Sequence, residues 1–143
     1  MTTQGAPALP RLSADEALIA LLVGAIETNQ HASPEEAARA ERVVHEVPRL
    51  RRLPRIRRGE IIERMKLAVG RHGAAAVMAA ASHQVPPALR PVAVSAIAEV
   101  MLAHGLDRFE SAALLDVAAR FGFTPEDTAA AIDQARRRSF HAS

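Results

Sequence analysis

The clearest structural signal in the chain is the stretch Ala96–Asp127, AIAEVMLAHGLDRFESAALLDVAARFGFTPED. Its pattern predicts a helix, a tight polar turn over His104–Asp107, a second helix, and the capped start of a third. A weaker version of the same pattern runs from Leu18 to Val47, with its turn between Thr28 and Ser33. The chain is therefore expected to contain two related helical hairpins.

The composition of the 143 residues supports an all-α fold in one domain. Apolar residues make up 49% of the chain but aromatic residues only 3%, and Ala, which favours helices most, dominates with Leu, Val and Ile. The absence of Cys excludes disulfides, thiolate nucleophiles and Cys-bound zinc. The longest apolar run, Ala17–Ile26, is about half of a bilayer span. Residues 1–12 lack the pattern of a signal peptide and are expected to form a flexible leader on a cytoplasmic protein.

Four helix starts share one signature, a capping residue followed three positions later by a carboxylate. The pairs are Ser13 with Glu16, Ser33 with Glu36, Asp107 with Glu110, and Thr124 with Asp127. With the apolar spacing, they predict a single compact domain over residues 13–138 with about seven helices, followed by a tail at 139–143. The expected helices cover Ala14–Thr28, Pro34–Glu46, Gly59–Val69, Ala74–Ser82, Pro87–Ala103, Arg108–Phe121 and Pro125–Arg138. The sixth of these is expected to bury Leu114, Leu115, Val117 and Ala118 and to end at a Gly122 cap.

The second hairpin reads Ala103-His104-Gly105, then Glu110, with Ala113, Leu114 and Val117 at helical spacing, then the run Phe121–Asp127. This order resembles the TerB-like family, the tellurite-resistance B type of domain, over roughly Asp15 to Asp133. The resemblance implies a non-enzymatic accessory or scaffold protein, linked to tellurite or general stress responses, that acts through contacts with other proteins. The Ala-rich helices also allow a homodimer.

The resemblance also implies a candidate metal site, because the turn acids of the family are associated with divalent cations such as calcium. Its residues here are Asn29, Glu36, His104, Asp107 and Glu110. Where the family has Asp, this chain has Asn29 and His104, and a neutral imidazole suits zinc better than calcium. The alternative is purely structural, with Asp107 and Glu110 forming a capping box and His104 a cation at a helix end.

An Arg-rich segment is the other candidate site. Residues 49–58 contain six arginines, Arg49, Arg51, Arg52, Arg55, Arg57 and Arg58. Dense Arg can neutralise the phosphates of nucleic acid or lie on the inner membrane surface, although no aromatic residue is interleaved for base stacking. The alternative is a solvated connector paired with acids such as Glu46, Glu60 and Glu63, with Leu50, Leu53 and Ile56 on the core. No Ser–His–Asp order or metalloprotease motif is visible, so an enzyme is not expected.

Overall fold

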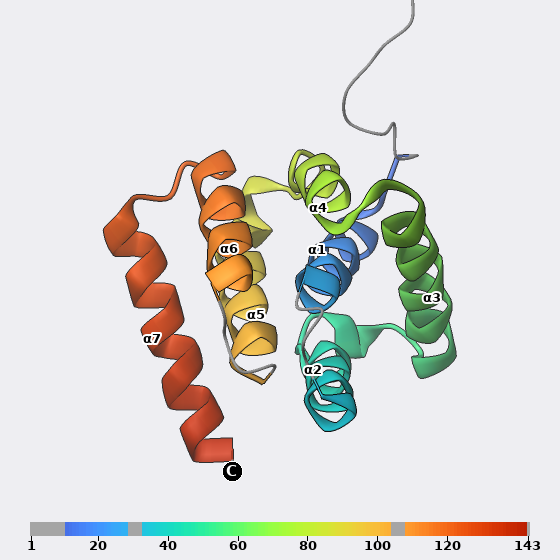
Figure 1. The fold of residues 1–143 in the computed structure, drawn as a ribbon, viewed down its shortest axis with the longest axis horizontal. Helices are drawn as coiled ribbons and strands as arrows, with labels where there is room; N and C mark the ends of the chain where they lie inside the picture. The colour runs from blue at the N-terminus through green and yellow to red at the C-terminus, as the bar shows by residue number, and fades with distance from the viewer. Residues whose placement is uncertain (1–10, 29–32, 104–107, 143) are drawn as a thin grey trace, which may run out of the picture.

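The computed structural model describes residues 11–28, 33–103 and 108–142, with the side chains at 108–111 and 139–142 left aside. Over these ranges the regular structure is entirely helical (Figure 1). The elements are α1 (Ala14–Thr28), α2 (Pro34–Glu46), the 3-10 turn η1 (Leu50–Arg52), α3 (Arg55–His72), α4 (Ala74–Ser82), the 3-10 turn η2 (Pro87–Leu89), α5 (Arg90–Ala103), α6 (Arg108–Arg120) and α7 (Pro125–Ala142). The expected all-α domain of seven helices is confirmed for this part of the chain.

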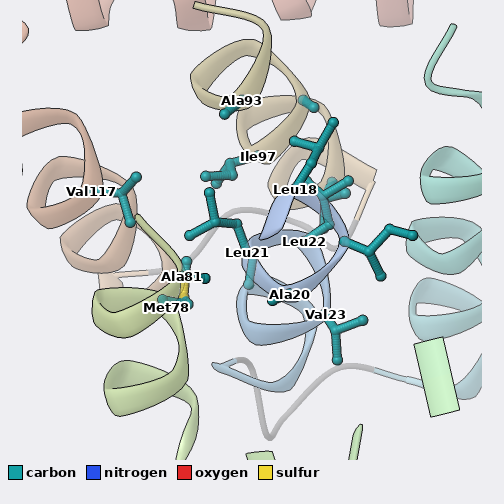
Figure 2. Close-up of a cluster of buried hydrophobic side chains, with 14 of the residues drawn as sticks. Leu18, Ala20, Leu21, Leu22, Val23, Met78, Ala81, Ala93, Ile97 and Val117 are labelled. Carbon is teal, nitrogen blue, oxygen red and sulfur yellow. The ribbon is translucent and has the colours of Figure 1, made fainter. Parts of the chain in front are cut away.

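Helix α1 lies at the centre of the fold because it is apolar on nearly every side. All nine residues from Ala17 to Ala25 are buried, and α1 contacts α2, α3, α4, α5 and α6. Figure 2 shows Leu18, Leu21 and Leu22 of α1 beside Met78 of α4 and Ile97 of α5. Helix α7 packs instead on α5, at the edge of the domain (Figure 1).

The predicted capping boxes form at the three helix starts that lie within the described residues. The backbone N–H of Ser33 donates to Glu36 at 2.9 Å, and the N–H of Glu36 donates to the Ser33 hydroxyl at 3.1 Å. The Ser13–Glu16 and Thr124–Asp127 pairs make the same reciprocal bonds. These bonds satisfy amides of the first helical turn, which have no partner inside the helix, so the starts of α1, α2 and α7 are where the sequence placed them.

Several boundaries differ from the sequence prediction, most of all the start of α3 and the end of α7. Helix α3 also ends at His72 instead of Val69, α5 begins at Arg90 instead of Pro87 after the 3-10 turn η2, and α6 ends at Arg120 instead of Phe121. Helix α3 begins at Arg55, four residues before the expected Gly59. Pro54 precedes the helix and does not break it. The carbonyl of Pro54 accepts a hydrogen bond from the N–H of Arg58 at 3.0 Å. Helix α7 continues to Ala142, through the expected tail. The cap at Gly122 is confirmed: its φ is 82°, and the N–H of Phe123 donates to Ala118 at 2.9 Å.

Two side chains expected in the core are exposed. Ile56 is 80% exposed because it lies in α3, about 140° around the helix from the buried Ile61. Leu115 is 55% exposed, while Leu114 and Val117 of the same helix are buried. At about 100° per residue, Leu115 falls just outside the buried face of α6. Both predictions were wrong because adjacent leucines and threefold spacing do not by themselves place the centre of a helix's buried face.

Candidate anion-binding site

Two leucines hold the Arg-rich segment on the core. Leu50 in η1 is fully buried, whereas its neighbours Arg51 and Arg52 are exposed. Leu53 is partly buried against the core, and Pro54 leads into α3. The segment is therefore partly a connector on the core, as expected, and partly the first turn of α3, which runs beside the end of α2.

Two arginines of the segment are paired with acids. Arg49 Nε lies 2.8 Å from a carboxylate oxygen of Asp15. Arg57 lies 3.6 Å from Glu16 and 3.7 Å from Glu60. Asp15 and Glu16 belong to the first turn of α1, more than thirty residues away in sequence, so of these three acids only Glu60 was anticipated. These contacts tie the connector to the central helix.

Arg58 has a different role. Its Nη1 donates to the backbone carbonyl of His45 at 2.6 Å, which ties the first turn of α3 to the last turn of α2. Of the other acids expected as partners, Glu63 pairs with Lys66 at 3.3 Å. Glu46 makes no ion pair with an arginine in the described part of the chain. The acids nearest in sequence thus leave part of the segment's charge uncompensated.

That uncompensated charge gathers around a cavity of about 370 Å³ between α2 and the start of α3. We call this the arginine cavity; its lining residues are Arg42, His45, Glu46, Arg51, Arg55 and Arg58. Four arginines and one glutamate therefore line this space. Among the described residues, Arg42, Arg51 and Arg55 have no acid within 4 Å. The site carries a concentrated positive potential.

Sequence reasoning named Arg51, Arg55, Arg58 and the acid Glu46, and it missed Arg42 and His45 of α2. Arg42 and His45 are three residues apart on α2, so they lie on one face of the helix. Their spacing was visible in the sequence, but the packing of that face against the Arg-rich segment was not. Conversely, Arg49, Arg52 and Arg57 belong to the predicted set but do not line the cavity.

His45 sits in this field as a neutral imidazole at neutral pH. Burial lowers the pKa of His45 below its usual value, the nearby Arg55 and Arg58 lower it further, and Glu41 opposes them. The Nδ1 of His45 and the Nε of Arg58 are buried without a hydrogen-bond partner among the described residues. A buried polar atom without a partner is costly, and both residues line the arginine cavity.

Two other cavities lie along α5 and α7, of about 560 Å³ and about 310 Å³. Their walls share Pro91, Ser95 and Gln134. Beside the smaller one, Arg138 lies 2.7 Å from Glu99 and also donates to the Ser95 hydroxyl. Burial raises the pKa of Glu99, although Arg138 opposes the shift. The charge of Arg138 is compensated by Glu99, unlike that of the arginines in the arginine cavity. The contacts of Arg138 attach α7 to α5.

The candidate metal residues fall mostly outside the described part of the chain. Asn29, His104, Asp107 and the side chain of Glu110 lie outside the described part of the chain. The carboxylate of Glu36 accepts from the Ser33 N–H in the capping box. The described residues contain no group of three or more His, Asp or Glu that could hold a metal ion. The metal site stays a prediction.

Within the described ranges, no helix is long and apolar enough to cross a membrane. Comparison of the chain with protein-family models, with curated proteins and with solved structures finds no match.

Proposed function

We propose that this protein is a non-enzymatic binding domain that recognises a phosphate-bearing anionic partner through the arginine cavity. The observation that supports the proposal is the convergence of four arginines, from α2, η1 and α3, on one concave site with a single carboxylate. The sequence offered nucleic acid and the inner membrane surface as partners for the Arg-rich segment.

The pattern of ion pairs supports binding rather than simple solvation. Arg49 and Arg57 are compensated by acids of α1 and α3, whereas Arg42, Arg51 and Arg55 lack an acidic partner within the described residues. Guanidinium groups remain charged at any physiological pH and present forked donors that match phosphate oxygens. Their chemistry favours holding an anion over transferring a proton.

A charge-matched pair of variants tests this proposal. The cavity variant is Arg42→Gln/Arg51→Gln/Arg55→Gln. The control variant, Arg52→Gln/Arg71→Gln/Arg137→Gln, removes the same charge from exposed arginines that do not line the cavity.

Binding to fluorescent single-stranded RNA, duplex DNA and anionic phosphatidylglycerol vesicles is measured for all three proteins at 50 and 200 mM salt. We expect the parent to bind at least one probe, with an affinity that falls steeply with salt. The cavity variant should lose about tenfold or more of that affinity, and the control should lose much less. Equal losses in the two variants, or no binding by the parent, would refute the proposed function.

A second candidate is the accessory or scaffold role implied by the TerB-like resemblance, in which the protein acts through protein contacts. Two observations favour it. The hairpins α1–α2 and α5–α6 are present, and α1 packs on α5. In addition, Ile56 and Leu67 are 80% and 71% exposed on α3. They are eleven residues apart, which places them on one line of the helix.

The scaffold role has its own test. A strain without this gene is exposed to tellurite and complemented with the parent chain or with Ile56→Ser/Leu67→Ser. The scaffold role predicts that the parent restores growth and the double variant does not, although both are equally folded by circular dichroism. Failure of the parent to restore growth would contradict the link to tellurite.

A further inference from the structure

We infer that the arginine cavity binds a phosphate monoester, in its dianionic form, carried on a small soluble molecule. This inference rests on the proposed function and names the chemical class of its ligand. It depends on the volume of the cavity, on the helices that line it and on the number of uncompensated charges around it.

The shape of the site suits a terminal phosphate group. Residues of two helices line the cavity, Arg42 and His45 from α2 and Arg55 and Arg58 from the first turn of α3. Figure 1 shows the short segment that joins α2 to the start of α3. A monoester has three terminal oxygens that can face both walls while its single ester bond points out of the cavity. A phosphodiester chain continues in two directions and requires an open groove or stripe.

The size of the cavity agrees with a small ligand. Its volume of about 370 Å³ lies within the roughly 300–1,000 Å³ of ordinary small-molecule sites. Four of the six lining residues, Arg42, Glu46, Arg51 and Arg55, are exposed, so the space opens to solvent. A soluble phosphate ester can therefore enter it without a rearrangement of the helices.

The charge of the site favours a dianion over a monoanion. A phosphate monoester carries about two negative charges at neutral pH, whereas a diester carries one per phosphate. None of the four lining arginines has an acidic partner within 4 Å among the described residues, and Glu46 is the one acidic residue in the lining. Attraction to the arginines grows with ligand charge, while repulsion from Glu46 offsets only part of it.

Two lining residues have hydrogen-bonding capacity that the described chain does not use. Arg58 is anchored through Nη1 to the carbonyl of His45, yet its Nε has no acceptor. His45 Nδ1 also has no partner. Both nitrogens are buried in the wall and are not exposed to the cavity, so the ion is held mainly by the exposed Arg42, Arg51 and Arg55. Arg58, whose guanidinium is already anchored, loses less side-chain freedom when it binds such an ion.

Binding of a dianion also changes the charge balance around His45. The charged groups that act on it are Arg55 and Arg58 from α3 and Glu41 from α2. A dianion offsets the two arginines, so it raises the pKa of His45 and favours the imidazolium. This form donates from both ring nitrogens. Proton uptake at His45 on addition of the anion therefore reports that the cavity is occupied. A histidine with only a structural role would not take up a proton under these conditions.

The test compares monoesters with diesters on the full chain. Isothermal titration calorimetry at constant ionic strength and pH 7 uses inorganic phosphate, adenosine 5′-monophosphate, and dimethyl phosphate as the diester. Vesicles of phosphatidic acid, a lipid monoester, and of phosphatidylglycerol, a lipid diester, form the membrane arm. The cavity and control variants defined above are titrated in parallel.

We expect inorganic phosphate and the nucleoside monophosphate to bind about tenfold or more tightly than the diester, and the cavity variant alone to lose this binding. If diesters bind as well as monoesters and depend on the cavity, the inference is overturned while the proposed function stands. Binding of phosphatidic acid vesicles without binding of either soluble monoester also overturns it. If no anion distinguishes the cavity variant from the control, both the inference and the proposed function fail.

Discussion

Replacement of Gly24 by alanine is expected to destabilise the fold at the contact between α1 and α4. A Cβ atom at Gly24 would lie 2.4 Å from Cγ and 3.1 Å from Sδ of Met78, and 3.5 Å from the carbonyl oxygen of Ala74. Met78 is only 2% exposed, so its side chain has little free space to move into. The two helices approach closely because position 24 has no side chain.

Two opposing terms set the size of the effect. Alanine gains about 1 kcal/mol over glycine from helix propensity, while overpacking of a well-packed core costs about 1–3 kcal/mol. The net loss expected for Gly24→Ala is therefore about 0–2 kcal/mol. Gly70 in α3 has open space around its Cβ position, so Gly70→Ala should gain up to about 1 kcal/mol. The two variants should differ by about 1–3 kcal/mol.

Urea unfolding monitored by circular dichroism gives the free energy of unfolding of each variant. A second background, Met78→Ala, removes both side-chain atoms that crowd position 24. In that background Gly24→Ala should no longer destabilise the protein and should approach the gain of Gly70→Ala. If Gly24→Ala stabilises the parent as much as Gly70→Ala does, the close packing of α1 on α4 is refuted.

Three further predictions concern protonation, capping and metal. The pKa of His45 is lowered in the folded state, so the free energy of unfolding should fall as pH drops below about 6.5, the unfolded value. Chemical unfolding at pH 7.5 and 5.0 should show this slope in the parent and in the exposed control His72→Gln, but a smaller one in His45→Gln. Ser33→Ala should cost about 1 kcal/mol because the capping box of α2 is lost, and an equal stability of the two proteins in urea would contradict this. If the turns bind calcium or zinc, an ion at a hundred times its Kd should stabilise the fold by about 2.7 kcal/mol, and a chelator should reverse the shift in melting temperature. No shift with either ion at millimolar concentration would exclude the metal site.

The helices could be predicted from the sequence because their ends carry local chemical signals. Ser13, Ser33 and Thr124 each form the reciprocal bonds that their spacing from a carboxylate predicts. The start of α3 was missed because it lacks such a signal: Pro54 precedes it without a side-chain cap. A proline is compatible with both a break and a helix start, and only the packing of the following turn distinguishes them.

The candidate site could be predicted only in part because a cavity is a property of packing. The density of arginine in residues 49–58 pointed to the correct segment. Which arginines are free was decided by Asp15 and Glu16, which compensate Arg49 and Arg57 from a distant part of the chain. The contribution of α2, including His45, likewise depends on how two helices meet. The local spacing of residues in the sequence predicts neither these ion pairs nor the contact between α2 and α3.

The central claim is most directly tested by the ring resonances of His45, followed by NMR across pH with and without inorganic phosphate. With phosphate present, the pKa of His45 should rise in the parent and in the Arg52→Gln/Arg71→Gln/Arg137→Gln control. The rise should be lost in Arg42→Gln/Arg51→Gln/Arg55→Gln. A pKa that phosphate leaves unchanged in the parent, or shifts equally in both variants, would contradict an anion site in the arginine cavity.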